Sequence, residues 1–493
     1  MVVSARLVDK RHRGNMFRVR SILPICLLIF CAALAGCRGT TQVGSQVVSS
    51  GNSSVVLAMT DTPPSNVTIL SAEVTLTGAT LTPGNVSLFS GSATVDLVRL
   101  QTDIAYLATA SKIPSGNYTS VTLTFANPSL TIENDTASPI VSGTTTCAVG
   151  SICTLPPTST ANLSTSVPLT SFSIASSSTT GLLIDVNLDN LLSASLGADF
   201  SAGTTVTSFT PAGHGAPPVG AEDVVGQVGS VNPSTNTFTL TNATASYSLK
   251  ADSTSTFFQF PSTGACTTPG FGCLQNNQIL SVDIGILSDG SILARNIVFE
   301  DADNSDAEIE GIITSTNVGS QQFNIVIQTM SAPISGLSLG QAITVQYSST
   351  QNPFDIDLVH ADNLQMSTAG FLFATPADLV VGQQVSVRQN SSSTATLINA
   401  DRVRLRMTRV TATVQRGLPN LFLVNLPSLF SGHGGITSIT AQTSLTPPTI
   451  YYEVGQNINS SNIVIGESVS VRGPLFNVSG TRTMVTTKVV LKP

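Results

Sequence analysis

Charged residues are scarce in this chain. They make up 10% of its 493 residues, against about 25% in an average domain. The first 36 residues hold six basic residues and one acidic residue, so the rest carries 15 basic (21 − 6) and 27 acidic (28 − 1) residues, a net charge of −12. No basic patch is left to neutralise phosphates, and the sequence therefore predicts no nucleic-acid partner. An anionic membrane surface would repel such a chain, so any attachment to a membrane must be covalent.

Aromatic and histidine side chains are also few. Tryptophan is absent and tyrosine occurs six times, which weighs against a carbohydrate- or matrix-binding adhesin, because sugar platforms favour Trp and Tyr rings. Beyond the first 36 residues the histidines are His214, His360 and His433, far apart in the chain, and we expect loop histidines of this kind to be solvated rather than metal ligands. No nucleophile elbow, zinc-protease motif or P-loop occurs. We therefore predict no enzyme activity, no catalytic residue and no cofactor. The adhesin, and a hydrolase with its site scattered over loops, are the alternatives.

The apolar run Ile22–Leu34 (ILPICLLIFCAAL) follows two basic residues, Arg18 and Arg20. This pattern indicates an export signal, and the run is too short for a transmembrane helix, which needs about 20 residues. The run ends in Leu34-Ala35-Gly36-Cys37, which is similar to the lipobox of bacterial lipoproteins: an aliphatic residue, two small residues and a cysteine. The resemblance implies that residues 1–36 are a signal peptide and that Cys37 carries a lipid. An ordinary signal peptide with a chance cysteine is the alternative.

The residues after the lipobox predict where the protein is held. In the resembled lipoprotein class, an aspartate after the lipidated cysteine favours the inner membrane, and the residue here is Arg38. We therefore expect a cell-envelope protein anchored by lipid to the outer membrane. One acyl chain anchors weakly, so two or three chains on Cys37 would be needed. The Gly-, Ser- and Thr-rich stretch that follows, residues 37–52, is predicted to be a flexible tether.

Four cysteines remain beyond Cys37, in two local pairs. Cys147 and Cys153 are close in sequence, and so are Cys266 and Cys273, each pair within Gly-, Pro- and Thr-rich sequence. In an exported chain this arrangement predicts two disulfides, Cys147–Cys153 and Cys266–Cys273. A metal site is the alternative, but the spacing is not Cys-x-x-Cys and no histidine is near.

Apolar residues alternate with polar ones along much of the chain. Clear examples are Val74–Thr77, Val121–Phe125 and Gly181–Asp189, where every second side chain is apolar. A period of two indicates half-buried strands, so the expected fold class is all-β. The best helical spacing, which predicts at most one short helix, is that of Leu97, Leu100, Ile104 and Leu107.

Three segments of the C-terminal half follow the same order of strand-like sequence. Entry strands are predicted at Val224–Val231, Ile309–Thr316 and Val410–Gly417, central strands at Gln278–Ile284, Val381–Arg388 and Ile465–Arg472, and closing strands at Ile292–Glu300, Ala395–Leu405 and Met484–Leu491. The spacing of roughly 85 to 100 residues exceeds that of solenoid repeats and favours beads on a string. The expected organisation is a signal peptide (1–36), a tether (37–52), an N-terminal β-sandwich-like domain (53–200), a linker (201–222) and three small β-barrel or sandwich repeats (223–305, 306–406, 407–493).

Two family resemblances support this organisation. Residues 53–195 resemble a family of bacterial lipoproteins called domain of unknown function 4382, through Asp61-Thr62-Pro63-Pro64, the turn Ile113–Tyr118 and the strand LLIDV. The C-terminal repeats look like domain of unknown function 5666, with Gly-x-Val at entry, a Gly-x-x-Val-x-Val centre and a closing Ala-x-x-Val strand. The first repeat departs from this pattern at Asn277, and the second carries extra sequence around Ser331–Met366. Neither resemblance implies a catalytic residue.

One acidic stretch, Glu300–Glu310 (EDADNSDAEIE), joins the first two repeats. Asp301, Asp303 and Asp306 form a weak candidate Ca²⁺ site, but the glycine of an EF-hand loop is missing, so a solvated turn is the favoured interpretation. The sequence as a whole predicts a membrane-tethered envelope lipoprotein with a non-enzymatic binding or structural role. An envelope glycan or protein is a candidate partner besides the membrane.

Overall fold

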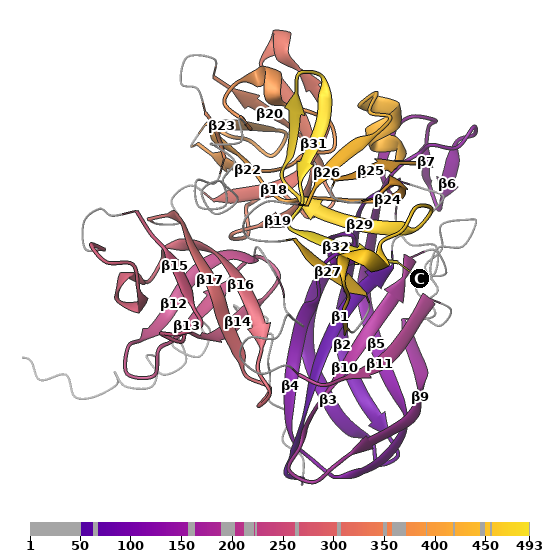
Figure 1. Ribbon diagram of the computed structural model, residues 1–493, viewed down its shortest axis with the longest axis vertical. Coiled ribbons are helices and arrows are strands. Elements are labelled where there is room, and N and C mark those ends of the chain that lie inside the picture. Colours follow the sequence, from indigo (N-terminus) through magenta and orange to yellow (C-terminus); the bar gives the residue numbers. More distant parts are fainter. Residues whose placement is uncertain are drawn as a thin grey trace, which may run out of the picture. The chain divides into compact units, whose positions relative to one another are not determined.

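The computed structural model describes residues 51–62, 68–155, 163–188, 203–211, 221, 224–261, 266–302, 307–348, 353–356, 371–390, 392–417, 420–443, 449–453 and 456–492. Strands dominate this part of the chain, which confirms the all-β class (Figure 1). The signal peptide, Cys37 and the tether up to residue 50 lie outside the described residues, as do His214 and His360. No helix within the described ranges is long and apolar enough to cross a membrane.

The N-terminal domain contains two sheets with a common core. One sheet has the order β11-β10-β1-β4, with bounds Thr204–Phe209, Thr179–Asn187, Ser53–Thr62 and Ala105–Ile113. The other has the order β3-β2-β5-β8 with β9 also paired to β5, with bounds Val86–Asp96, Thr68–Thr82, Gly116–Glu133, Ile152–Leu155 and Ser164–Ile174. The predicted alternation is confirmed in β5, where Val121, Leu123 and Phe125 are buried and Thr124 is exposed. Apolar residues on every second position thus build the inner face of this sheet.

Two local expectations in this domain need correction. The helical spacing after residue 97 gives only the short 3₁₀-helix η1 (Leu97–Gln101), and Leu107 lies in β4 instead. The segment expected to be a linker contains β11, which pairs with β10 (Figure 1). Phe209 of β11 packs near Leu183 of β10, and Leu183 is buried. Sequence near the linker lacked periodicity because β11 is a short edge strand.

Each of the first two C-terminal repeats forms one sheet that closes on itself. The first has β12 (Val224–Asn232), β13 (Thr237–Thr241), β14 (Ser246–Lys250), β15 (Phe257–Gln259), β16 (Ile279–Ile286) and β17 (Ile292–Asp301), in the order β14-β13-β12-β16-β17-β15. The second has β18 (Glu308–Asn317), β19 (Gln322–Met330), β20 (Ala342–Tyr347), β21 (Phe354–Ile356), β22 (Gln384–Gln389) and β23 (Leu397–Leu405), in the matching order. Parallel pairs β14–β17 and β20–β23 close the two barrels.

The third repeat follows the same plan with one strand divided. Its strands are β24 (Thr408–Arg416), β25 (Asn420–Val424), β26 (Ile439–Gln442), β27 (Ile450–Glu453), β28 (Gln456–Asn457), β29 (Ser468–Gly473), β30 (Leu475–Val478), β31 (Thr481–Val485) and β32 (Lys488–Leu491). The closing strand expected at Met484–Leu491 is two strands: β31 pairs with β26 and β32 pairs with β29. When the short edge strands are left out and the five main strands of each repeat are numbered along the chain, the order in the closed sheet is 1-2-3-5-4-1. Strands 3 and 5 are parallel, as in the OB fold.

The central glycine of the repeat pattern has a conformational cause. Gly382 and Gly466 have φ of 90° and 95° in the turn before the central strand, which therefore begins later than expected, at Gln384 and Ser468. Asn277, the departure in the first repeat, holds the same place with φ of 75°. Asparagine is among the few residues that tolerate positive φ, so this departure preserves the turn.

The described residues form one compact unit rather than the beads on a string expected from the repeat spacing. The core of the N-terminal domain is continuous with that of the first barrel, and Leu70 of β2 packs within the core of the third. Hydrogen bonds also join distant segments: the Thr131 hydroxyl donates to the Gly340 carbonyl over 2.7 Å. The boundaries between repeats, and the ability of each repeat to fold alone, stay predictions.

Candidate functional site

The scarce charged side chains gather in the interior around η1. Asp96 and Asp103 flank this helix, and both are buried. Arg406, Arg472 and Lys488 of the C-terminal repeats are buried as well. Buried charges are costly unless paired and hydrogen-bonded, so their partners define the candidate site.

Asp103 is the centre of the first group of ion pairs. Its Oδ2 accepts hydrogen bonds from Nη2 and Nε of Arg409 over 2.6 and 2.9 Å. Lys488 Nζ lies 3.5 Å from Oδ1, and Arg472 Nε lies 3.9 Å from Oδ2. Burial alone would raise the pKa of Asp103, but these three cations hold it well below its usual range. Asp103 therefore stays ionised and ties η1 to β24, β29 and β32.

A second group connects η1 with the second barrel. Arg99 Nη1 lies 3.3 Å from Glu310 Oε2, and Gln384 Nε2 donates to Glu310 Oε1 over 3.1 Å. Gln384 also donates to Gln328 Oε1 over 2.9 Å, and Gln328 in turn donates to the Leu70 carbonyl over 2.8 Å. Burial opposes ionisation of Glu310, but nearby arginines lower its pKa. This chain of contacts passes from the N-terminal domain through β18, β22 and β19.

The junction of the first and second barrels holds a third group. Glu300 pairs with Arg404 and, over 2.7 Å, with Arg406, while Glu308 pairs with Arg402. Glu300 and Glu308 belong to the acidic stretch that was expected to be a solvated turn, and they are instead only 2% and 1% exposed. Arg404 of β23 and Arg406 just after it reach the Glu300 carboxylate from the neighbouring repeat, which explains the burial.

The weak Ca²⁺ candidate receives no support from the described residues. Asp301 Oδ2 accepts a hydrogen bond from Arg388 Nη1 over 2.6 Å, so the guanidinium group of Arg388 takes the position of a metal ion at this carboxylate. Asp303 and Asp306 lie outside the described residues. Within the described ranges, no three His, Cys, Asp or Glu side chains come together as a metal site.

A cavity of about 100 Å³ lies against η1. Its wall includes Asp96, Arg99 and Asp103 of the N-terminal domain, Tyr247 of β14 and Gln328 of β19. Burial raises the pKa of Tyr247 to about 12, so its hydroxyl stays protonated and can only donate or accept hydrogen bonds. The described wall holds no histidine or cysteine, and it is suited to holding a small polar molecule rather than to activating a nucleophile.

His433, expected to be a solvated loop residue, pairs with a buried carboxylate. It ends the short π-helix η5 (Leu429–His433), and its Nε2 meets the carboxylate of Glu133 from β5. Burial raises the pKa of Glu133, and the charge of His433 lowers it. The side chain of His433 remains 40% exposed, so it is in contact with water as expected. The unexpected finding is its contact with Glu133.

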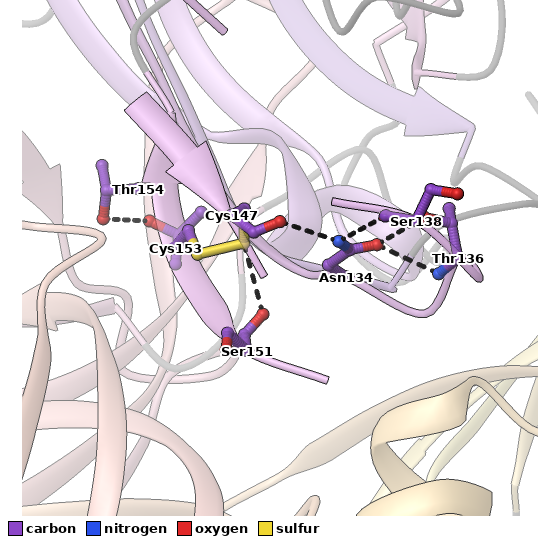
Figure 2. The surroundings of a disulfide bond; sticks show 8 residues. Asn134, Thr136, Ser138, Cys147, Ser151, Cys153 and Thr154 are labelled. Carbon is purple, nitrogen blue, oxygen red and sulfur yellow. Dashed lines mark hydrogen bonds between the residues drawn. A yellow bond between two sulfur atoms is a disulfide. The ribbon is translucent and has the colours of Figure 1, made fainter. Parts of the chain in front are cut away.

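Both predicted disulfides are confirmed: Cys147–Cys153 and Cys266–Cys273. Figure 2 shows how the first is framed: Asn134 Nδ2 donates to the carbonyls of Cys147 and Ser138 over 2.9 and 3.0 Å. The bond joins β7 (Thr145–Cys147) to β8, so it pins a loop at the end of β5. The four sulfurs are thereby accounted for, and the alternative of a metal site at these cysteines is wrong.

Comparison with known proteins identifies one part of the chain. Residues 52–213 match the model of a family described as a domain of unknown function (DUF4382). The match begins just before β1 and ends after β11, so it spans the N-terminal domain and reaches beyond residue 195, where the sequence resemblance ended. No curated protein and no solved structure matches the chain.

Proposed function

We propose that the chain is an exported lipoprotein, anchored by a lipid on Cys37 to the outer membrane, whose folded part has a structural or binding role and no enzymatic activity. Part of the proposal is that the three barrels belong to the family called domain of unknown function 5666. Their common strand order, and the positive φ at the glycine of the pattern, support a common origin of the repeats.

The structural role is supported by ion pairs that join the N-terminal domain to the barrels. Asp103, Arg99 and Glu133 of the N-terminal domain all pair with residues of the second or third barrel. Removing one partner of a buried ion pair typically costs about 3–5 kcal/mol. A body held by several such pairs keeps its parts in fixed positions, which suits a spacer or platform held near a membrane.

The support for an anchor comes from the sequence. The apolar run before Cys37 and the small residues Ala35 and Gly36 favour lipid transfer to the cysteine. An acidic chain gains nothing from anionic lipid headgroups, so a covalent lipid is the form of attachment that its charge permits.

A binding role is the second candidate, and the cavity beside η1 favours it. Arg99 Nη1 is buried there and forms the ion pair with Glu310, but it makes no hydrogen bond within the described part of the chain. Tyr247 adds an aromatic ring and a protonated hydroxyl to the same wall. Binding to a glycan array that is lost on Tyr247→Ala would favour the adhesin, and hydrolysis of generic esters or glycosides would favour the scattered hydrolase.

The anchor is tested with the full chain expressed in a Gram-negative host. Cys37→Ser removes the acceptor thiol, and Cys31→Ser is the matched control because that cysteine lies within the expected signal peptide. We expect wild type and the control to enter the detergent phase and the outer-membrane fraction, whereas Cys37→Ser stays unprocessed or soluble. Equal partitioning of all three proteins would contradict the anchor.

A further inference from the structure

Two carboxylates face each other across strands β2 and β3. Glu73 is the register partner of Asp96, so the two side chains leave the same face of the sheet. The Ser71 hydroxyl lies beside both: it donates a hydrogen bond to Asp96 Oδ2 over 2.9 Å and lies 3.5 Å from Glu73 Oε1. Carboxylates that share a site resist double ionisation.

The hydrogen bonds assign the negative charge of this pair to Asp96. Its Oδ1 accepts from the backbone N–H groups of Ala72 and Val98 over 3.0 and 3.1 Å, in addition to the bond from Ser71. Within the described residues, Glu73 has only the long contact with Ser71. Donors aimed at a carboxylate favour its ionised form, so Asp96 keeps the charge and Glu73 keeps the proton.

A loop of the second barrel, residues 331–341, lies over this pair. The hydroxyls of Thr131 and Thr154 donate to the Gly340 carbonyl over 2.7 and 3.3 Å. Gly340 has φ of 73°, and a Cβ on it would come within 2.9 Å of Thr131 Oγ1 and 3.7 Å of Glu73 Oε1. The backbone of the loop thus touches the sheet closely, at the place where Glu73 would gain a charge.

We propose that the Glu73–Asp96 pair is a pH-sensitive contact between the N-terminal domain and the second barrel. While Glu73 holds its proton, the pair carries one charge and the 331–341 loop seats on β2 and β5. When the proton is lost, two adjacent charges are covered by this loop, and the loop loosens so that water can reach them. The protein then changes the fit between two of its parts without unfolding.

The surroundings of Glu73 set the pH at which this happens. Burial raises the pKa of Glu73 to about 8, and the charge of Asp96 adds to the effect. Burial also raises the pKa of Asp96, and its three hydrogen bonds and the charge of Arg99 oppose that effect. The buried carboxyl of Asp61 also interacts with Asp96. The loop, β8 and β19 carry no free titratable side chain, and the titratable residues of β5, Tyr118 and Glu133, lie near its two ends. No cation on these elements therefore compensates a charge on Glu73.

The test is hydrogen exchange of the full chain, measured by mass spectrometry at pH 6, 7, 8 and 9 and corrected for intrinsic exchange rates. In the wild type, protection of peptides from residues 331–341 and 68–76 should fall about tenfold for each pH unit from pH 6 to pH 8 and level off by pH 9, because an opened loop lets Glu73 ionise at its ordinary pKa. Glu73→Gln mimics the protonated side chain and should keep full protection at all four pH values. Glu467→Gln, the same change on the third barrel, should behave as the wild type.

The variant Gly340→Ala tests whether hydrogen exchange of residues 331–341 reports the contact between this loop and the sheet. The added Cβ meets Thr131, so protection of residues 331–341 should be low at every pH. A wild type without a pH-dependent loss, an equal loss in Glu73→Gln, or full protection in Gly340→Ala would each overturn the proposal.

Discussion

Replacing Asp103 with asparagine tests the group of buried ion pairs around this carboxylate. The change keeps the shape of the side chain and removes its charge, while Arg409, Arg472 and Lys488 stay buried around it. One pair of charges at about 4 Å is worth about 4 kcal/mol at an effective dielectric constant of about 20. Desolvation offsets much of this attraction, and loss of one buried partner costs about 3–5 kcal/mol net. We expect Asp103→Asn to be destabilised by that amount.

The assay is urea unfolding of the full chain, followed by circular dichroism and by limited proteolysis. Asp401→Asn is the matched control, because Asp401 is 30% exposed and pairs with the partly exposed Arg388. An exposed pair is worth about 0–1 kcal/mol, so this control should barely change stability. Adding Lys488→Met to Asp103→Asn should restore part of the loss by removing one unpaired charge. Equal effects of Asp103→Asn and Asp401→Asn would refute the reasoning.

Four further predictions follow from other parts of the fold. The pKa of Glu73 is raised from 4.5 to about 8, so the wild type should lose stability as pH rises through that window, by up to about 5 kcal/mol. Glu73→Gln should remove this loss, so that its urea midpoint exceeds that of the wild type at pH 9 but not at pH 4. Asn277→Gly should change the melting temperature little, whereas Gly382→Ala should lower it clearly, because φ is 90° and a Cβ would overlap the Phe430 ring. Joint replacement of Cys147 and Cys153 by serine should cost about 2 kcal/mol in the same unfolding assay, the value for a short closed loop. Residues 220–305, and residues 307–493 as a pair of repeats, should each give a β-type circular dichroism spectrum and a cooperative melt, and a fragment that stays unfolded alone would contradict the repeat boundaries.

Local features of the fold could be predicted from the sequence because local rules govern them. Alternation identified β5, since one face of this strand is buried. Short spacing in an exported chain identified both disulfides. The pattern around Asn277 and Gly382 marked a real turn, although its positive φ was visible only in the structure.

Contacts between distant residues could not be predicted. Asp103 and Arg409 are 306 positions apart, and no periodicity links them. A signal was present nonetheless: in a chain with so few charges, Arg404 and Arg472 lie within strands, where an inward charge needs a partner. The identity of that partner depends on how the domains pack, which local patterns do not encode. The same holds for β11 and for the contact between His433 and Glu133.

Mass spectrometry of the protein extracted from the outer membrane tests the proposed function most directly. The account predicts that the mature chain begins at Cys37 and that its N-terminal peptide carries a diacylglyceryl group on that sulfur. An N-terminal peptide that begins elsewhere, or an unmodified Cys37 within a longer chain, would contradict it.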